Sequence, residues 1–583
     1  MTKGKIINIV ANLISIEVEG KVGQNEICHV IARDTKLRSE VIKVIGNTAF
    51  AQVFESTRGV KIGDAVEFSG HLLEIELGPG LLSQNFDGLQ NNLDKLDSTF
   101  LERGVISDAL DRSKKYEITP LVSTGDTVLA ADWLAETIEN NLSHKIMVPF
   151  AYEGHFKVKK IAKKGNYSIE DEIAVLVDTK GKEHSVSMIQ KWPVKIPIKT
   201  YDHKPRPFKI LQTGMRVIDT MNPITEGGTG FIPGPFGTGK TVLQHAIAKN
   251  GDADIIIVTA CGERANEVVE IFTEFPHLID PRTGRTLQER TCIVCNTSSM
   301  PVSSREASVY VGMTIAEYYR CMGLKVLLLA DSTSRWAQAL REMSNRLEEL
   351  PGPDAFPVDL PAIIANFYAR AGFVYLNNGK TGSVTFIGTV SPAGGNLKEP
   401  VTESTSKVAR CFYALNQGRA DSKRYPAIET VDSYSKYIDY DEFKEYANEN
   451  IQKGWTGLVN QAKDYLIRGA EARDQIAILG DDAVPIEYHR QFWKSELLDF
   501  VFLQQDSFDK VDMNCEMDRQ KYMFNKVMSI CKMEPDFEVF TEVSDYYKKM
   551  INLMRQMNYS EYNSGDFKKY ESELKVLLAQ KEN

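Results

Sequence analysis

The residues best suited to do chemistry form one stretch: Gly234, Pro235, Phe236, Gly237, Thr238, Gly239, Lys240 and Thr241. The stretch fits the phosphate-binding loop pattern, in which a glycine is followed after four residues by Gly-Lys-Thr or Gly-Lys-Ser. Its glycines let backbone N–H groups turn inward around phosphate oxygens. Lys240 places a positive charge on the β and γ phosphates, and the Thr241 hydroxyl can ligate Mg²⁺. The stretch therefore predicts a site for a nucleoside triphosphate.

The residues on either side of this loop support the prediction. The apolar segment 230–233 suits the end of a strand, and residues 242–249 repeat apolar side chains at helical spacing. A strand, a loop and a helix in this order point the helix N-terminus at a bound anion. We expect the loop to join a core strand to a helix.

Two carboxylates follow apolar strands, at the sheet edge where open parallel sheets bind ligands. Asp331 ends the apolar run 326–330 and resembles a Walker B acid that supports Mg²⁺. Its alternative role is to cap the next helix. Glu263 follows the strand 255–258 and could polarise the attacking water, or could simply be an acid in the first turn of a helix. Arg264 could contact phosphate or pair with Glu267, and both remain open.

The elements around these residues divide the chain into five predicted regions. They are a small N-terminal β-barrel (1–70), a connecting segment (71–109), a β-rich block (110–195), an α/β nucleotide-binding domain (196–434) and a helical domain (435–583). Short alternating strands broken by glycines indicate the barrel. Apolar β-branched runs that alternate with helical patterns indicate a mostly parallel sheet.

Composition narrows the classes of function. A net charge of −10 over 583 residues argues against a nucleic-acid partner held by bulk positive charge. The chain shows no apolar run of membrane-span length and no signal peptide, so we expect a cytoplasmic protein with at most an indirect membrane role. Among eight cysteines the only close pair, Cys292 and Cys295, lies in a β-like run and is read as buried strand. The lysine-rich run 157–164 is read as a solvated face.

Five segments together resemble the catalytic A subunit of the V/A-type rotary ATPases. They are the phosphate-binding loop and the segments Gly262–Glu267, Ala330–Glu342, Glu76–Gly80 and Pro426–Ser435. The resemblance covers nearly the whole chain and is weakest in the last hundred residues. It implies an N-terminal β-barrel, a protruding β-rich region, a RecA-like P-loop ATPase core and a C-terminal helical domain. It also implies ATP and ADP as ligands, with Mg²⁺.

The resemblance carries roles to individual residues. It gives Lys240 and Thr241 the phosphate and Mg²⁺ contacts, Glu263 the catalytic carboxylate, Arg264 a polar support and Asp331 the Walker B acid. Tyr425 falls where the family usually has a phenylalanine against adenine, and its ring keeps an aromatic face there. Gln504 and Phe508 match the C-terminal side of the adenine pocket.

The resemblance also implies partners. Three A subunits would alternate with three B subunits in an A3B3 hexamer, and each B subunit would supply an arginine finger. Central-shaft and peripheral-stalk subunits would connect this hexamer to a membrane sector that moves H⁺ or Na⁺. The protein would then be cytoplasmic and peripheral to the membrane.

Three residues depart from the family pattern. Ala265 replaces a usual glycine, Glu429 stands where Asp, Asn or His is usual, and Asn396 stands where Asp is common.

Two other classes of protein are alternatives to this assignment. The nearest are F-type β chains, type III secretion ATPases and Rho-like helicases, but they lack the β-rich block before the loop. The noncatalytic B subunit lacks the loop lysine and the catalytic glutamate, and both residues are present here.

Overall fold

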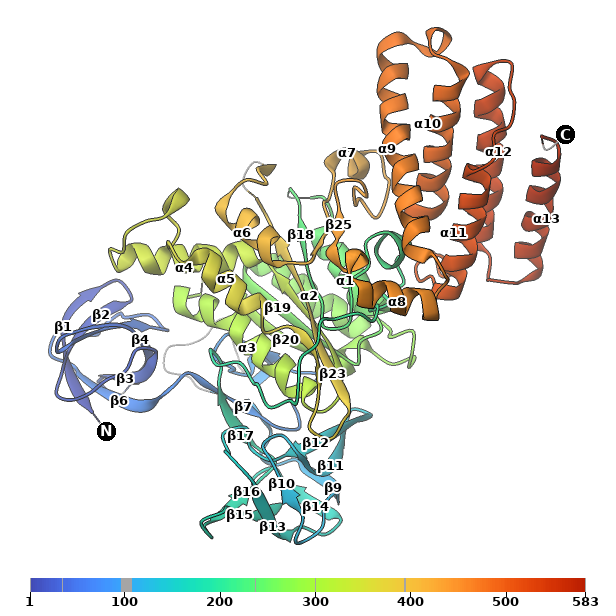
Figure 1. Ribbon diagram of the computed structural model, residues 1–583. Coiled ribbons are helices and arrows are strands. Elements are labelled where there is room, and N and C mark those ends of the chain that lie inside the picture. The colour runs from blue at the N-terminus through green and yellow to red at the C-terminus, as the bar shows by residue number, and fades with distance from the viewer. Residues whose placement is uncertain are drawn as a thin grey trace. The chain divides into compact units, whose positions relative to one another are not determined.

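The chain folds into two compact units. The computed structural model describes residues 2–33, 35–95, 107–235, 237–298, 300–392 and 395–581. The first unit comprises residues 1–206, 253–390 and 398–408, and the second comprises residues 207–252, 391–397 and 409–583. Figure 1 labels their helices and strands. Each unit therefore combines segments that lie far apart in the sequence.

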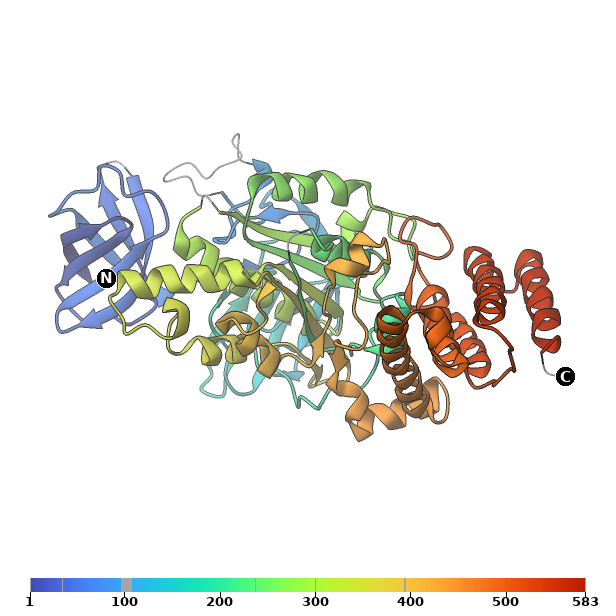
Figure 2. The same ribbon diagram turned by 90° about the horizontal axis from the view of Figure 1, so that it is seen from above.

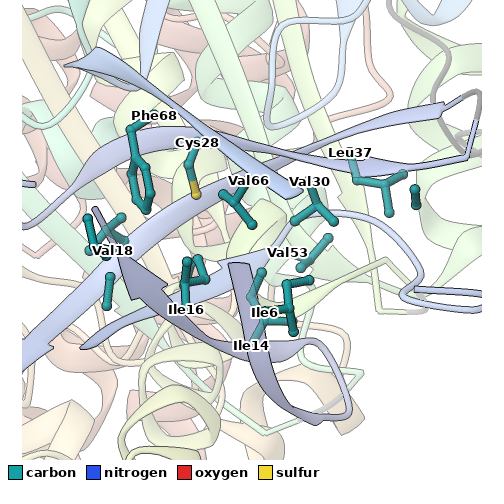
Figure 3. Close-up of a cluster of buried hydrophobic side chains, with 14 residues drawn as sticks. Ile6, Ile14, Ile16, Val18, Cys28, Val30, Leu37, Val53, Val66 and Phe68 are labelled. Atoms are coloured by element: carbon teal, nitrogen blue, oxygen red, sulfur yellow. The ribbon is translucent and has the colours of Figure 1, made fainter. Parts of the chain in front are cut away.

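The N-terminal strands of the first unit close into a barrel in the order β1-β2-β5-β4-β3-β6. Alternate residues point inward, as the period of two in a strand requires. Figure 3 shows ten labelled inward side chains, from Ile6 to Phe68, which together come from all six strands. The predicted barrel is confirmed. Its strands are β1 (Lys3–Val10), β2 (Leu13–Val18), β3 (Glu26–Ala32), β4 (Thr35–Ile45), β5 (Thr48–Val53) and β6 (Ala65–Leu72).

The β-rich block of the first unit consists of two four-stranded antiparallel sheets. One has the order β10-β13-β15-β16 and the other β12-β11-β9-β14. A separate two-stranded ladder joins β7 (Glu74–Leu77) to β17 (Gln190–Pro193), so the chain enters and leaves the block side by side. The strands of the two sheets are β9 (Lys115–Pro120), β10 (Thr127–Val128), β11 (Trp133–Glu139), β12 (Leu142–Met147), β13 (Phe156–Ile161), β14 (Gly165–Ser168), β15 (Ala174–Val177) and β16 (Glu183–Val186).

A buried carboxylate holds this block to the nucleotide-binding part of the same unit. Glu139 accepts hydrogen bonds from the backbone N–H of Gly80 at 2.7 Å and of Leu82 at 3.0 Å. The other oxygen of Glu139 lies 2.6 Å from His144 Nδ1 and accepts from the Tyr319 hydroxyl at 3.1 Å. These partners come from both sides of the junction, so one carboxylate fixes the base of the block.

The lysine-rich run lies on the surface of the block, on and just after β13. Lys159, Lys160 and Lys164 each pair with a glutamate of a neighbouring segment, and all three lysine side chains are exposed. Exposed ion pairs of this kind contribute little stability. The interpretation of the run as a solvated face is consistent with these contacts.

The rest of the first unit is a parallel sheet with helices packed against it. Strands β23, β21, β19, β20 and β8 lie in this order, and β22 pairs antiparallel with β23. Helices α2, α3 and α4 pack on these strands. The strands are β8 (Asn85–Phe86), β19 (Ile255–Glu263), β20 (Thr291–Thr297), β21 (Lys325–Asp331), β22 (Gly372–Tyr375) and β23 (Thr381–Val390). The helices are α2 (Ala265–Glu274), α3 (Val302–Arg320), α4 (Thr333–Arg346), α5 (Leu360–Tyr368) and α6 (Pro400–Val408).

The predicted parallel sheet is confirmed in these strands, which are almost wholly buried. Cys292 and Cys295 both lie in β20 with buried thiols, as the sequence pattern indicated. Burial raises the pKa of the Cys295 thiol to about 12. Such a thiol is a packing group rather than a nucleophile, because it stays protonated near neutral pH.

The second unit contains the phosphate-binding loop and the C-terminal helices. Strand β18 (Thr229–Pro233) pairs in parallel with β24 (Cys411–Phe412), which pairs antiparallel with β25 (Tyr434–Ser435). The predicted helical domain is confirmed, and Figure 2 shows its long helices nearly end-on. The α-helices are α1 (Lys240–Asn250), α7 (Gln417–Asp421), α8 (Asp441–Asn450), α9 (Trp455–Leu479), α10 (Ile486–Leu498), α11 (Met517–Cys531), α12 (Phe540–Tyr559) and α13 (Gly565–Ala579). The unit also contains two π-helical segments, η2 (Val217–Met221) and η9 (Asp499–Leu503), and two 3-10 helices, η7 (Lys436–Asp439) and η8 (Asp481–Ala483).

A glycine lets α9 and α10 approach closely. A methyl group built on Gly469 of α9 would overlap Cβ and Oγ of Ser495 on α10. Gly457, near the start of the same helix, has nothing within 4 Å of the equivalent position. The two glycines therefore differ in packing while sharing one helix.

We expect Gly469→Ala to destabilise the helical domain by about 1–3 kcal/mol, the usual cost of overpacking. Gly457→Ala is the matched control and should stabilise α9 by up to about 1 kcal/mol, because alanine favours a helix over glycine. Thermal unfolding of the full chain, followed by circular dichroism, checks both. Equal effects of the two substitutions would contradict the close α9–α10 contact.

Candidate nucleotide-binding site

The phosphate-binding loop joins β18 to α1 as the sequence predicts. Gly237 and Gly239 take φ values of +83° and +86°, a region that residues with a side chain rarely occupy. A methyl group built on either glycine would have nothing within 4 Å, so the backbone borders open space there. Gly239 caps α1 and offers no side-chain oxygen to its first turn. This arrangement suits an anion at the helix N-terminus.

The lysine of the loop folds back on the loop itself. Lys240 Nζ donates to the carbonyl oxygens of Gly234 at 2.8 Å and Pro235 at 2.9 Å. Thr238 Oγ1 donates to the same Pro235 carbonyl at 2.9 Å. These contacts hold the ammonium group beside the loop. Thr241 lies in the first turn of α1, and Phe236 lies outside the described residues.

A cavity of about 520 Å³ adjoins the loop, and all its lining residues belong to the second unit. Gly237, Thr238 and Gly239 line it together with one face of α1. Tyr425 lines it from the segment after α7, and Gln504 and Phe508 line it from the segment after η9. The tyrosine ring is 48% exposed and the phenylalanine ring 93% exposed. Aromatic faces beside a phosphate-binding loop suit a nucleoside base.

Several residues of this cavity carry no motif and were missed by sequence reasoning. Phe500 comes from η9, and Arg555, Asn558 and Tyr559 come from α12. The last three lie in the part of the chain where the resemblance is weakest. Only the packing of α12 brings them to the cavity, so no local pattern could have revealed them.

The two predicted carboxylates end neighbouring parallel strands of the first unit. Glu263 is the last residue of β19 and Asp331 the last residue of β21, with Ala260 in register with Asp331. Thr389 Oγ1 donates to Asp331 Oδ1 at 2.6 Å, which orients that carboxylate. The carboxyl ends of parallel strands meet at one edge of a sheet, where ligands bind.

Neither alternative role fits the position of these acids. Ser332, not Asp331, is the N-cap of α4. Glu263 is a strand residue, and the acid in the first turn of α2 is Glu267. The exposed Arg264 is the N-cap of α2.

The environment of Glu263 favours its neutral form. Burial raises its pKa to about 8, helped by a hydrogen bond with Glu267 and by the negative charges of Asp331 and Glu267. Arg335 acts in the opposite direction. A carboxyl group whose pKa lies near the working pH is the kind of group that exchanges protons in catalysis.

The donors available to a metal are oxygen atoms. Among the residues that the structure describes, no three His, Cys, Asp or Glu side chains gather at metal-ligating positions. The Thr241 hydroxyl and the Asp331 carboxylate are hard donors of the type that Mg²⁺ uses together with nucleotide phosphates. The residues present therefore fit Mg²⁺ in their chemistry.

Comparison with known proteins places the whole chain in one family. Family models match residues 6–70 (ATP synthase alpha/beta family, beta-barrel domain), 107–195 (ATPsynthase alpha/beta subunit barrel-sandwich domain), 214–435 (ATP synthase alpha/beta family, nucleotide-binding domain) and 444–537 (C-terminal domain of V and A type ATP synthase). The V-type ATP synthase alpha chain of Treponema denticola is 49% identical over 100% of this chain and 97% of its own. That of Borrelia garinii subsp. bavariensis is 48% identical over 99% of each chain.

The chain belongs to the V-type ATP synthase alpha chain family. The resemblance to the A subunit of V/A-type rotary ATPases and the predicted fold class are thereby confirmed. As a member of this family, the chain has a nucleotide-binding domain, and its family implies a multisubunit rotary complex. In the described part of the chain no helix is long and apolar enough to cross a membrane.

The three departures from the family pattern occupy different environments. Ala265 is the first residue of α2, where a helical φ suits an alanine as well as a glycine. Asn396 is exposed. Glu429 lines a second cavity of about 530 Å³ rather than the one beside the loop, and burial raises its pKa. None of the three lines the cavity beside the phosphate-binding loop.

The raised pKa of Glu263 predicts a pH dependence of stability. Its folded pKa of about 8 exceeds the ordinary value of 4.5, so the folded state binds the proton more tightly. The stabilisation is complete below pH 4.5 and is lost as the pH rises through 8. The slope is at most about 1.4 kcal/mol per pH unit in this window.

We therefore expect the free energy of unfolding of the wild-type chain to fall more steeply between pH 6 and pH 8 than that of Glu263→Gln, because the amide does not titrate. Glu267→Gln removes the neighbouring charge and should give an intermediate slope. Urea unfolding at a series of pH values measures all three. Parallel curves for wild type and Glu263→Gln would show that the pKa of Glu263 is not raised.

Proposed function

We propose that this chain is the catalytic subunit of a V/A-type rotary ATPase, which hydrolyses or synthesises ATP and couples that reaction to rotation and to H⁺ or Na⁺ transport. The observation that carries the proposal is the loop at the start of α1, which opens on a cavity lined by Tyr425 and Phe508. A chain similar over its full length to V-type ATP synthase alpha chains has here both the loop lysine and the strand-end glutamate. The noncatalytic alternative lacks both.

The chain's own groups divide the work as follows. The loop glycines and the α1 N-terminus bind the phosphates, and Lys240 supplies charge to the β and γ phosphates. Glu263 in its ionised form accepts a proton from the attacking water and orients it toward the γ phosphorus. Tyr425, Gln504 and Phe508 hold the base. Arg264, beside the catalytic glutamate, supports the site as a polar group.

Thr241, through its hydroxyl, and Asp331, through its carboxylate, would hold Mg²⁺. When bound, the ion would neutralise developing charge on the phosphate oxygens. Thr389 keeps the Asp331 carboxylate oriented through the 2.6 Å hydrogen bond. Asp331 raises the pKa of Glu263, so neutralisation of the Asp331 charge would favour the ionised form of Glu263.

The proposal extends to partners. Three copies alternate with three B subunits, and an arginine of the B subunit completes the charge at the γ phosphate. Central-shaft and peripheral-stalk subunits connect the hexamer to the membrane sector, so the chain works at the cytoplasmic side without entering the bilayer. The proposal includes no nucleic-acid partner.

Substitutions of Glu263 and Asp331 should affect the activity of the assembled complex in different ways. Glu263→Gln should keep MgATP affinity within a few fold and lower turnover by about two to four orders of magnitude, because a general base is lost. Asp331→Asn should make activity depend more steeply on Mg²⁺ concentration. Single-turnover hydrolysis and nucleotide titration separate these effects.

Lys240→Ala serves as the reference variant, since it should lose turnover and weaken binding together. Wild-type turnover in Glu263→Gln would show that Glu263 is not the base. Wild-type turnover in Lys240→Ala would overturn the phosphate-binding assignment itself.

A further prediction concerns the isolated chain. Without an arginine from a neighbouring subunit its ATPase rate should lie about 10³ to 10⁵ below that of the complex. The measurement is steady-state hydrolysis by the purified monomer, with and without added B subunit. A monomer that matches the complex would point to a self-sufficient nucleotidase.

A further inference from the structure

The wall of the cavity that carries Gln504 and Phe508 is a segment without regular structure. Residues 504–516 lie between η9 and α11 and form neither helix nor strand. We term this segment the base-side loop, and six of its residues line the cavity: Gln504, Gln505, Asp506, Ser507, Phe508 and Asp512. A loop of this length has many conformations, so its shape must be fixed by specific contacts.

One arginine contributes several of these contacts. The Arg216 side chain is fully buried, and its guanidinium donates to the carbonyl oxygens of Phe502 at 2.8 Å and Gln504 at 2.6 Å. It also donates to both carboxylate oxygens of Asp512, at 2.6 Å and 3.4 Å. Three points along the loop and its entry are thus tied to one planar group, a geometry that lysine cannot reproduce.

The Asp512 carboxylate also fixes the shape of the base-side loop. Asp512 Oδ2 accepts from the backbone N–H of Asp506 at 2.8 Å, which closes the loop on itself. Only 5% of the Asp512 side chain is exposed. A buried charge pair of this kind imposes one arrangement, because either partner left alone would be a buried charge without compensation.

Gln505 connects this arrangement to the segment that carries Tyr425. Its side-chain oxygen accepts from the Arg216 N–H at 3.0 Å, and its amide nitrogen donates to the carbonyl oxygens of Gly214 at 2.7 Å and Asp512 at 2.8 Å. The backbone N–H of Gln505 donates to the Tyr425 carbonyl at 2.9 Å. The two aromatic sides of the cavity are therefore linked through the same buried group of residues.

We infer that Arg216 and Asp512 are positioning residues that set the affinity of the site for the base of its nucleotide. Asp512 lines the cavity and Arg216 does not, and both hold the base-side loop in shape through the hydrogen bonds described above. The inference rests on the proposed function, since it assigns the base side of that same cavity. Weakening the Arg216–Asp512 pair should therefore lower the affinity of the site for the base and leave its affinity for the phosphates unchanged.

The test compares two ligands on the full chain, MgATP and magnesium tripolyphosphate, which has phosphates but no base. We expect Asp512→Asn to raise the Kd for MgATP at least about tenfold, because misplaced groups bind poorly. The Kd for tripolyphosphate should change less than about twofold. In the assembled complex the same variant should raise KM for ATP and keep kcat within about twofold. A role confined to stability would instead lower the active fraction and kcat at unchanged KM.

Lys494→Met is the matched control, because Lys494 is also a buried cation, pairs with Glu534 at 2.7 Å in the same unit and does not line the cavity. It should leave both Kd values unchanged. Arg216→Lys keeps the charge but not the fork and alters a residue that does not line the cavity. It should show the same separation in weaker form, both where Asp512→Asn does not fold and where that variant also loses a direct contact with the nucleotide.

A wild-type Kd for MgATP in the altered chain would overturn the inference. Equal losses for MgATP and tripolyphosphate would overturn it as well, since the pair would then act on the whole site. A wild-type chain that binds neither ligand would instead overturn the proposed function, so the two failures are distinguishable.

Discussion

The backbone between β18 and α1 has to reverse direction and border an anion within a few residues, and much of the second unit follows from that constraint. Two left-handed glycines make the turn, and neither has protein atoms where a side chain would stand. The side chains of Thr238 and Lys240 hold the loop through hydrogen bonds to its own carbonyl oxygens. The loop is anchored by β18, which is buried throughout, and by the buried face of α1 with Leu243 and Ile247.

The charged groups of the two units have distinct surroundings. Lys240 donates to two carbonyl oxygens of the phosphate-binding loop. Glu263, in its own unit, keeps a proton because burial and neighbouring acids disfavour its charge. A positive charge placed near Glu263 would lower its pKa, so cation binding and deprotonation of Glu263 are linked.

Sequence reasoning succeeded where the signal is local. The phosphate-binding loop, the apolar strands that end in Glu263 and Asp331, and the helical spacing of 242–249 are each contained in a short window. Placing Tyr425, Gln504 and Phe508 on one cavity required the family resemblance, because they come from segments about eighty residues apart. The structure does bring them to one cavity with the loop.

Sequence reasoning could not find the Arg216–Asp512 pair, because no local pattern marks it. Its partners are 296 residues apart, and neither belongs to a motif. The same holds for Arg424, which lies beside Tyr425 and pairs with Glu496 and Asp499. The order of strands in the β-rich block is likewise set by pairings between distant segments. Local patterns specify elements, whereas these contacts depend on how the elements pack.

The base side of the cavity combines buried charged groups with an exposed aromatic residue. Arg216, Asp512 and Gln505 are buried and hydrogen-bonded to backbone groups of the base-side loop. Phe508 of the same loop is 93% exposed. Covering a phenylalanine side chain contributes about 1.5–3 kcal/mol. In the proposed site a base that covers Phe508 would gain this free energy, and a loop already held by buried groups would need little further ordering. A buried ion pair is by itself a weak source of stability, and here its inferred role is to fix the loop that carries Phe508.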